Sequence, residues 1–427
     1  PEVIDSDYKY LAFPYVPDDL VLTLREDESP YSWQEAYDEA IANGKRIPTK
    51  TELLNYLAST GNTPLVNENA WTPVVAPEYS NGKDWLFIGV HPNYFLGKSH
   101  TEHHGYPTWG DSSTYTTTRL YCEVIGNPTQ TEYSVTFDEP DGTECDILIV
   151  GGGGAAGTGI GAGGGAGGVV YIENYTMNGD YKIKVGNGGK NPIVPFQTYK
   201  IPGVSGYDSG IFNIDNTNIT YTGNSANFSL VGKGGGGGGA YAGGTDLYQP
   251  LSGGSSGGVG CRNTNNSTIS GSVTATQGNT YWNGTSFEPG GYLGGSFGKE
   301  GYASAGGGGA GGVGESAPNG DNGGDGGAGI VNNITGTFQG YAGGGGGSTN
   351  SSTGANKGRG GSVVIDGIIV YLGGDGIPYS TSDNQPGGDG LINTGSGGGG
   401  GGWSDANELP GSGGSGIVII RYKTTKG

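Results

Sequence analysis

The sequence has few of the residues that most often carry chemistry. Its 427 residues include four histidines, and 20 lysines and arginines against 40 acidic residues. The three cysteines, Cys122, Cys145 and Cys261, cannot build a disulfide framework and lack the spacing of a metal site, so the redox compartment stays open. The net charge of −20 argues against nucleic-acid binding, because phosphate contacts need concentrated Lys and Arg.

Long apolar runs and catalytic groupings are missing as well. No stretch is long enough for a transmembrane helix and no signal peptide follows Pro1, so we expect a processed chain or one assembled without a secretory signal. No nucleophile and base stand at a meaningful spacing. The sequence therefore predicts a protein that is not an enzyme, with no membrane insertion and no nucleic-acid partner.

Glycine is abundant but very unevenly distributed. Only 8 of the 95 glycines lie in residues 1–126. This contrast predicts two domains: an ordinary globular domain at residues 1–126 and a glycine-rich scaffold domain at residues 127–427.

The first domain has two helix start signals. Ser32 and Glu35 form a capping box for a helix over about residues 33–43, and Thr49 and Glu52 form a second box. Strand-like pieces follow at 85–88 and 119–124. We expect a small α+β domain.

Several strings of this domain carry a family resemblance: Trp33-Gln-Glu-Ala36, Gly44-Lys-Arg-Ile-Pro-Thr49, Glu52-Leu53, Trp71, Trp85 and Arg119-Leu-Tyr-Cys122. Residues 30–124 resemble the C-type-lectin-like fold of the formylglycine-generating-enzyme and bacterial-adhesin type. The calcium-coordinating Glu-Pro-Asn or Gln-Pro-Asp triplet of animal lectins is absent, and so are the paired catalytic cysteines of the enzymes. The resemblance implies a fold and permits ligand binding without supplying an active site.

The histidines are clustered, within fourteen residues: His91, His100, His103 and His104. Glu102 and Asp111 lie nearby, and imidazoles commonly gather at metal sites. The segment is a predicted loop without the i, i+4 spacing that fixes two imidazoles on one helix face. A metal site at His100, His103 and His104 and a solvated histidine-rich loop both stay open, the second being favoured.

A strand over residues 146–150 followed by Gly-x-Gly-x-x-Gly at 152–157 mimics a dinucleotide-binding fingerprint. That fingerprint requires a helix beginning at the glycines, whose N-terminus holds the pyrophosphate. Residues 158–168 contain seven glycines, each costing about 1 kcal/mol relative to alanine in a helix. The sequence therefore predicts no helix and no cofactor here.

Similar glycine tracts recur at 151–168, 234–239, 306–312, 343–347 and 397–402. They lack the period of collagen, and strand-forming segments between them argue against disorder. These segments are 146–150, 169–172, 181–185, 362–365, 368–372 and 417–422. Polyproline II geometry has no internal hydrogen bonds, so the tract amides must find partners in neighbouring tracts. We predict an all-β/polyglycine II domain, with residues 151–168 spanning roughly 56 Å as one tract.

This domain also carries a resemblance, in the strings at 147–154, 163–171, 181–189 and 413–422. Residues 131–423 resemble the glycine-rich domain of phage tail proteins and large DNA-virus surface proteins, with the polyglycine II sandwich of phage tail adhesins. The resemblance implies display: tracts hold loops that meet a host surface. It implies a virion-surface or extracellular location, with a host glycan or receptor, other proteins of the same particle and a second copy of the chain as partners.

Residues 262–305 form the richest candidate contact loop, and its aromatic residues are the candidate ligand-binding residues: Tyr281, Trp282, Phe287 and Tyr292. Exposed aromatics beside polar groups suit stacking on sugar rings. The alternative, which we favour, is that these side chains pack the loop onto the scaffold.

Aspartates stand among the glycines at Asp321, Asp325, Asp375 and Asp389. They suggest a calcium β-roll, but the nine-residue repeat of that fold is absent, which argues against structural calcium.

Glycosylation sequons occur only in the glycine-rich domain, at Asn174, Asn218, Asn227, Asn265, Asn266, Asn283, Asn333 and Asn350. In a eukaryotic secretory setting they would mark surface loops, whereas in a phage they would carry no meaning.

Two functions are therefore expected. The first is a non-enzymatic virion-surface protein, in a fibre, tail or capsid, with structural and attachment roles. The second is a secreted microbial or algal cell-surface or filament protein with an assembly role.

Overall fold

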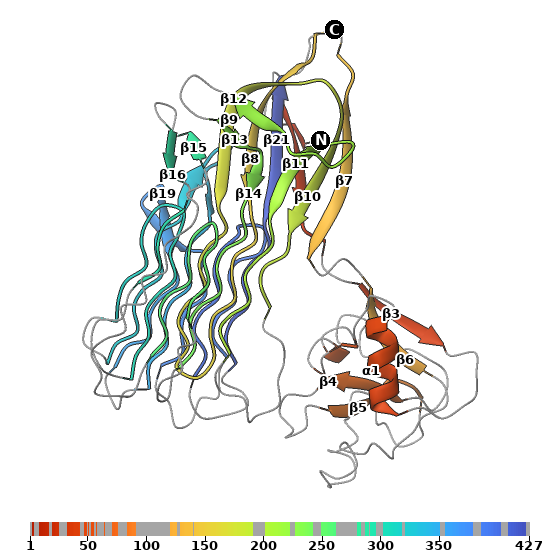
Figure 1. Cartoon of the computed structure of the whole chain (residues 1–427), viewed down its shortest axis with the longest axis vertical. Coiled ribbons are helices and arrows are strands. Elements are labelled where there is room, and N and C mark those ends of the chain that lie inside the picture. Colours follow the sequence, from red (N-terminus) through yellow and green to blue (C-terminus); the bar gives the residue numbers. More distant parts are fainter. Residues whose placement is uncertain are drawn as a thin grey trace. The chain divides into compact units, whose positions relative to one another are not determined.

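The computed structural model of the chain divides into two compact units (Figure 1). Unit 1 comprises residues 1–16, 129–191 and 199–427, and unit 2 comprises residues 17–128 and 192–198. The structure describes residues 2–3, 8–16, 19–24, 32–42, 47–48, 50, 53–54, 57, 64, 71–75, 83–90, 120–125, 129–139, 141–190, 201–222, 227–241, 249–261, 280–282, 287–289, 291–295, 302–317, 321–350, 355–378, 386–402 and 409–423.

Unit 2 contains the helix α1 and two antiparallel strand pairs. These elements are β3 (Asp19–Leu24), α1 (Trp33–Ala42), β4 (Trp71–Val75), β5 (Lys83–Phe87) and β6 (Leu120–Ile125), with β3 paired to β6 and β4 to β5. The capping box is confirmed: Ser32 N donates to Glu35 Oε2 at 2.6 Å, and Glu35 N donates to Ser32 Oγ at 3.3 Å. Trp33 packs with buried Trp85 and donates from Nε1 to the Val74 carbonyl at 2.9 Å.

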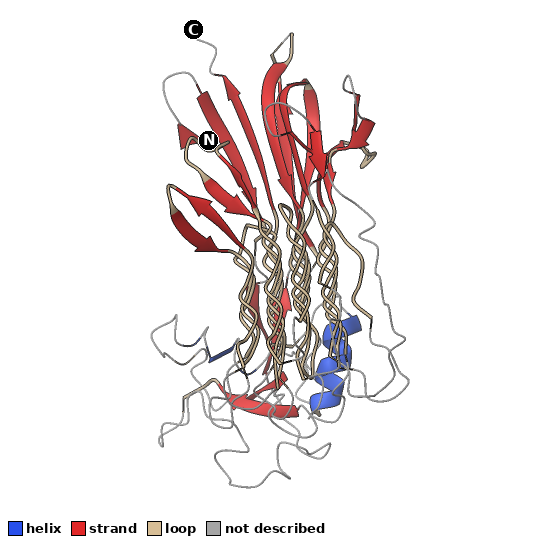
Figure 2. Ribbon diagram, turned by 90° about the vertical axis from the view of Figure 1, so that its left-hand side faces the viewer, coloured by secondary structure: helices blue, strands red, loops and turns tan. Residues whose placement is uncertain are grey.

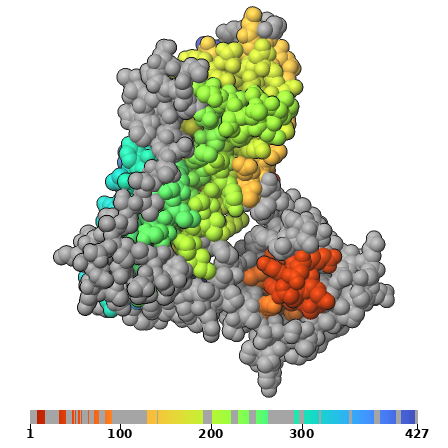
Figure 3. All heavy atoms as spheres, in the orientation of Figure 1, coloured from red at the N-terminus to blue at the C-terminus, as the bar shows by residue number. Residues whose placement is uncertain are grey.

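Two sheets form one end of unit 1. The larger has the order β1-β2-β21-β8-β9-β15-β16 and the smaller the order β14-β11-β10-β7. Their strands are β1 (Glu2–Val3), β2 (Tyr8–Pro14), β7 (Gln130–Phe137), β8 (Thr143–Val150), β9 (Val169–Met177), β10 (Gly179–Gly186), β11 (Ser209–Asn213), β14 (Val231–Gly232), β15 (Thr280–Trp282), β16 (Phe287–Pro289) and β21 (Ile417–Lys423). Figure 3 shows the face of unit 1 built largely from the yellow-to-green part of the chain.

Three hairpins complete the described strands of unit 1. They are β12 (Thr220–Thr222) with β13 (Asn227–Ser229), β17 (Ile330–Asn332) with β18 (Gln339–Tyr341), and β19 (Ser362–Ile365) with β20 (Ile368–Tyr371). The expected strands at 146–150, 169–172, 181–185, 362–365, 368–372 and 417–422 are confirmed to within a few residues at their ends.

The apolar core of unit 1 lies at the strands. Alternate residues of β8, such as Ile147 and Ile149, join Ile183 of β10 and Ile420 of β21 in one buried cluster. The other face of β8 places Leu148 in a second buried cluster, with Ile419 and Tyr341. Because both faces of β8 and β21 are buried, these strands are continuous apolar runs in the sequence.

The glycine tracts extend from the strands as bundled segments without regular secondary structure (Figure 2). Their hydrogen bonds have a period of three, as a helix of three residues per turn requires. In the arm at 151–158, every third amide donates to the same neighbouring segment. The donor–acceptor pairs are Gly151–Gly168, Gly154–Gly165 and Gly157–Ala162; Gly152–Tyr207, Ala155–Val204 and Thr158–Ile201; and Gly153–Gly414 and Ala156–Gly411.

The carbonyls of the same arm are used in the same way. They accept from the tract at 233–241, from the tract at 395–402 and from Gly189. The arm thus exchanges hydrogen bonds with six other described segments, three through its amides and three through its carbonyls. The prediction that tracts satisfy one another's amides is confirmed.

The expectation of one 56 Å tract over residues 151–168 is wrong. Gly159 and Ile160 have φ of 62° and 54°, and the chain reverses there into antiparallel arms at 151–158 and 162–168. Each arm reaches about 25 Å at the polyproline II rise. The absence of a helix after the glycines is confirmed, so a dinucleotide fingerprint has no helix N-terminus here.

Glycine is required in the tracts mainly for close approach. Gly164, Gly345 and Gly397 have no positive φ, but a Cβ on any of them would lie inside van der Waals contact with a carbonyl of another tract. Two serines of the tracts find partners for their side chains: the hydroxyls of Ser304 and Ser348 donate to the Gly161 carbonyl at 2.6 and 3.0 Å.

The first two strands, β1 and β2, belong to the glycine-rich unit. β2 pairs antiparallel with β21 over seven residues, from Tyr8 opposite Lys423 to Pro14 opposite Ile417. Thr131 Oγ1 accepts from Val16 N at 2.9 Å, which joins the end of this segment to β7. Residues 17–128 of unit 2 are therefore an insertion between β2 and β7, whereas the expected boundaries were 1–126 and 127–427.

Two glycine substitutions of the same kind should differ sharply in effect. Gly345→Ala places a methyl against the Gly398 carbonyl and should lower the free energy of unfolding by about 3 kcal/mol or more. At Gly312 a Cβ would meet only Ala328 atoms at 3.5 and 3.6 Å, so Gly312→Ala should be neutral or slightly stabilising. Denaturant unfolding measures both, and equal losses would contradict the close-packing account.

Candidate functional site

The remote end of the polyglycine body is where its tracts are connected. The arms at 151–158 and 233–241 run away from the strands, and those at 162–168 and 201–207 run back. The intervals 191–200, 242–248, 351–354, 379–385 and 403–408 lie outside the described residues. The described residues on both sides of the last four of these intervals lie at this remote end.

The candidate aromatic residues separate into two groups. Tyr281 and Trp282 lie in β15 and Phe287 in β16, where Trp282 and Phe287 are cross-strand partners. Tyr281 pairs in parallel with Tyr171 of β9, so this hairpin forms one edge of the seven-stranded sheet. The structure thus brings three of the four residues together on one hairpin.

Tyr292 lies apart from the hairpin, in a tract. Its backbone N–H donates to Ser255 Oγ at 3.2 Å, its carbonyl accepts from Ser256 N at 3.1 Å, and the residue is half-buried. Residues 291–295 and 302–305 are likewise part of the hydrogen-bonded body. The segment 262–305 is therefore not a single loop.

Aspartate side chains accept tract amides. Asp325 Oδ1 accepts from Arg359 N at 2.7 Å, Asp375 Oδ1 from Gly360 N at 2.9 Å, and Asp389 Oδ1 from Ser412 N at 2.7 Å. Asp208 Oδ1 does the same for Gly234 N at 2.8 Å. We call these four carboxylates the amide caps, because each accepts a hydrogen bond that a carbonyl of a further tract would otherwise accept.

Three of the four amide caps could have been found in the sequence. Gly-Gly-Asp-Gly occurs three times, at 323–326, 373–376 and 387–390, each time with the capping aspartate in third position. Asp321 differs: its backbone carbonyl accepts from Thr349 Oγ1. Within the described ranges, no three His, Cys, Asp or Glu side chains are placed to hold a metal ion.

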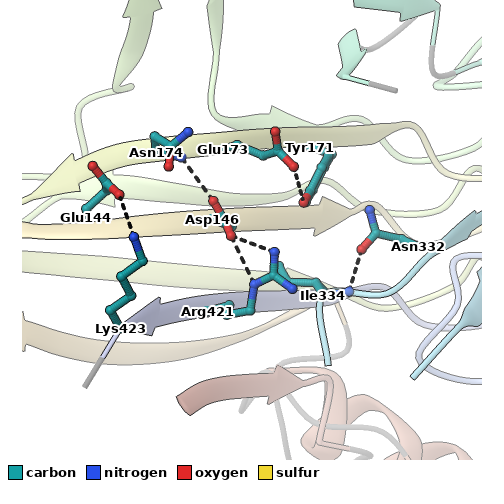
Figure 4. A network of polar contacts seen from close by, with 9 residues as sticks. All are labelled: Glu144, Asp146, Tyr171, Glu173, Asn174, Asn332, Ile334, Arg421 and Lys423. Atoms are coloured by element: carbon teal, nitrogen blue, oxygen red, sulfur yellow. Dashed lines mark hydrogen bonds and ion pairs between the residues drawn. The ribbon is translucent and has the colours of Figure 1, made fainter. Parts of the chain in front are cut away.

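A polar network fixes the register of the central strands (Figure 4). Arg421 Nε and Nη2 donate to Asp146 Oδ2 at 3.0 and 2.7 Å, and both side chains are largely buried. Asp146 Oδ1 accepts from Asn174 N at 3.0 Å, at a β-bulge where Asn174 has φ of 56°. The carboxylate thus joins β21, β8 and β9, which is a structural role.

Cys145, next to this network, is not suited to act as a nucleophile. Burial, together with the charges of Asp146 and Glu144, raises the pKa of its thiol to about 12, so the thiolate is scarce at neutral pH.

The predicted sequons differ in accessibility. Asn174, Asn218 and Asn333 are exposed, and Asn350 is half-buried with its backbone N–H donating to the Tyr302 carbonyl at 2.6 Å. Asn227 lies in β13. Outside the described residues lie Asn265, Asn266 and Asn283, and also the histidines His91, His100, His103 and His104.

Comparison with known families supports the assignment of a glycine-rich domain. A family model described as a glycine-rich domain matches residues 129–347. No curated protein matches the chain. Among the described residues, none of the helices has the length and apolar character needed to cross a bilayer.

Removal of one amide cap should measurably destabilise unit 1. Asp325→Ala leaves the Arg359 amide without its carboxylate partner and should cost about 1 kcal/mol, since the site is exposed. Asp325→Asn keeps an acceptor oxygen at the same place and should recover most of that loss. Denaturant unfolding compares the two variants; equal destabilisation by both would show that hydrogen-bond capping is not what this side chain contributes.

Proposed function

We propose that this chain, which belongs to the glycine-rich domain family, is a non-enzymatic structural and attachment protein of a virion surface. Its body would serve as a rigid scaffold in a fibre, tail or capsid. The segments at its ends would contact a glycan or receptor on the host. No cofactor takes part in this function.

The observation that supports the proposal is that the backbone groups of the body form hydrogen bonds with one another. The described tract amides and carbonyls bond to one another, and the outer amides of four positions are covered by aspartate caps. A body whose backbone hydrogen bonds are made within the body itself can hold many connecting segments of unrelated sequence, because those segments contribute little to its stability. Scaffolds of this kind suit recognition, in which loops vary on a rigid support.

The hairpin β15–β16 is the proposed contact element among the described residues. Tyr281, Trp282 and Phe287 lie within it, at an edge of the sheet. Aromatic rings offer a large apolar area with little entropy cost and stack on the apolar faces of sugars. Tyr292 is not part of this contact element, because its backbone is held in the body by Ser255 and Ser256.

A second candidate function is a secreted microbial or algal cell-surface or filament protein. The exposure of Asn174, Asn218 and Asn333 favours it, because a glycosylation acceptor must be accessible. In that setting the same scaffold would serve assembly rather than attachment.

Adsorption of the full-length protein to host cells tests the proposal. The double substitution Trp282→Ala with Phe287→Ala should lower binding at least tenfold, because two stacking rings are lost. Tyr302→Ala, at an exposed tyrosine elsewhere on unit 1, serves as the matched control and should leave binding unchanged. Thermal unfolding checks that both variants are folded.

Isolation of the native chain distinguishes the two functions. Co-purification with virus particles supports the first. Recovery from cell walls or filaments, with glycans on Asn174, Asn218 and Asn333, would instead support the second and remove the attachment proposal.

A further inference from the structure

Unit 1 has an exposed apolar surface at its strand end. It is made by the hairpins β17–β18 and β19–β20 and by the turn at 391–395, and its large side chains are between 46% and 70% exposed. We call this surface the apolar tip; its members are Phe338, Val364, Ile368, Ile369, Tyr371, Leu391 and Ile392. Isolated exposed apolar residues are ordinary, but a group on neighbouring elements marks an interaction surface.

The three elements of the apolar tip are held together by their buried residues. Val363 and Leu372, both buried, approach the place where Gly340 of β18 would carry a Cβ. The Leu391 amide donates to the Leu372 carbonyl at 2.8 Å, and the Ala342 amide donates to the Thr394 carbonyl at 2.7 Å. The exposed side chains are therefore carried by three elements that are packed and hydrogen-bonded to one another.

The β19–β20 hairpin also presents an open strand edge. Its turn residues Asp366 and Gly367 have φ of 51° and 80°, the geometry of a two-residue type I′ turn. With Ile365 opposite Ile368 as the closing pair, the backbone N–H and C=O groups of Ile369 and Tyr371 point away from β19. Among the described residues, β19 is the only strand that pairs with β20.

The exposed edge lacks the features that normally prevent strand pairing. β20 reads Ile-Ile-Val-Tyr, without charge, proline or bulge. An exposed, apolar edge strand of this kind is a template for pairing with another chain. The chain outside this strand carries a net charge of −20, so its acidic surface repels anionic bilayers and most of the surface of another copy.

We propose that the apolar tip is a homodimer interface, in which β20 pairs antiparallel with β20 of a second copy about a two-fold axis. Identical strands are self-complementary under this symmetry, and β20 itself carries no charge, so two acidic copies can approach along it at low electrostatic cost. The pair forms a continuous four-stranded sheet. Val364 and Ile369 are cross-strand partners within the hairpin. The row of neighbouring side chains that they form therefore continues onto the β20 strand of the second copy.

The size of the apolar tip fits a dimer of moderate affinity. Seven large side chains at this exposure amount to roughly 600 Å² per copy, somewhat below the ~800 Å² per partner of a standard interface. We therefore expect a monomer–dimer equilibrium with a dissociation constant of about micromolar order.

Sedimentation velocity of the full-length chain over a hundredfold range of concentration tests the proposal. The unsubstituted protein should convert from monomer to dimer as concentration rises. Ile368→Lys places a charge in the interface and should weaken dimerisation at least a hundredfold. Ile369→Pro removes the outward N–H at an edge position where proline is tolerated, and should have a similar effect.

A matched control separates the tip from a general effect of charge. Ile214→Lys changes another exposed isoleucine, 55% accessible, in the turn after β11, and should leave the dimer intact. The Tm of each variant checks folding, and loss of dimer with an unchanged Tm supports the proposal.

Three results would overturn the proposal. The first is a protein that stays monomeric throughout the concentration range. The second is a dimer that survives both Ile368→Lys and Ile369→Pro. The third is a monomer that binds neutral phosphatidylcholine vesicles and loses that binding in Ile368→Lys, which would identify a lipid surface as the occupant of the tip.

Discussion

Unit 1 depends on one interaction: the hydrogen bond from a backbone N–H of one glycine tract to a backbone carbonyl of an adjacent tract. A helix with three residues per turn satisfies none of its own amides, so each tract needs neighbours on several sides. Those neighbours can approach only where no Cβ intervenes: at Gly164 and Gly345, a backbone carbonyl lies where a Cβ would be. The tracts bury backbone rather than side chains, and the apolar packing of unit 1 is concentrated where β8, β10 and β21 meet.

Features set by local chemistry were predictable. The capping box at Ser32 and Glu35, six of the strands of unit 1 and the pairing of tracts followed from residue type and from the need to satisfy amides. The reversal at Gly159 and Ile160 was not, because isoleucine rarely adopts positive φ and only the surrounding tracts impose it. The pairing of β2 with β21 was also missed, since nothing local in residues 8–14 indicates so distant a partner.

The candidate site was predictable only in part, for a similar reason. Tyr281, Trp282 and Phe287 do share a hairpin, but Tyr292 belongs to the body because its backbone fits between Ser255 and Ser256. Aspartates among glycines suggested calcium, whereas Asp325 accepts an amide hydrogen bond. The role of such a carboxylate depends on whether its tract lies at the boundary of the bundle, and that position is a property of the whole assembly of tracts.

The pairing of β2 with β21 has a consequence for how the protein is made. β2 is synthesised long before its partner β21, so the central sheet cannot be completed until β21 has left the ribosome. Until then β2 can pair only with the short strand β1, and β8 lacks the neighbour that covers its other edge. Translation that stops early would release a polypeptide with open strand edges, the kind of species that chaperones bind and that aggregates when they are scarce.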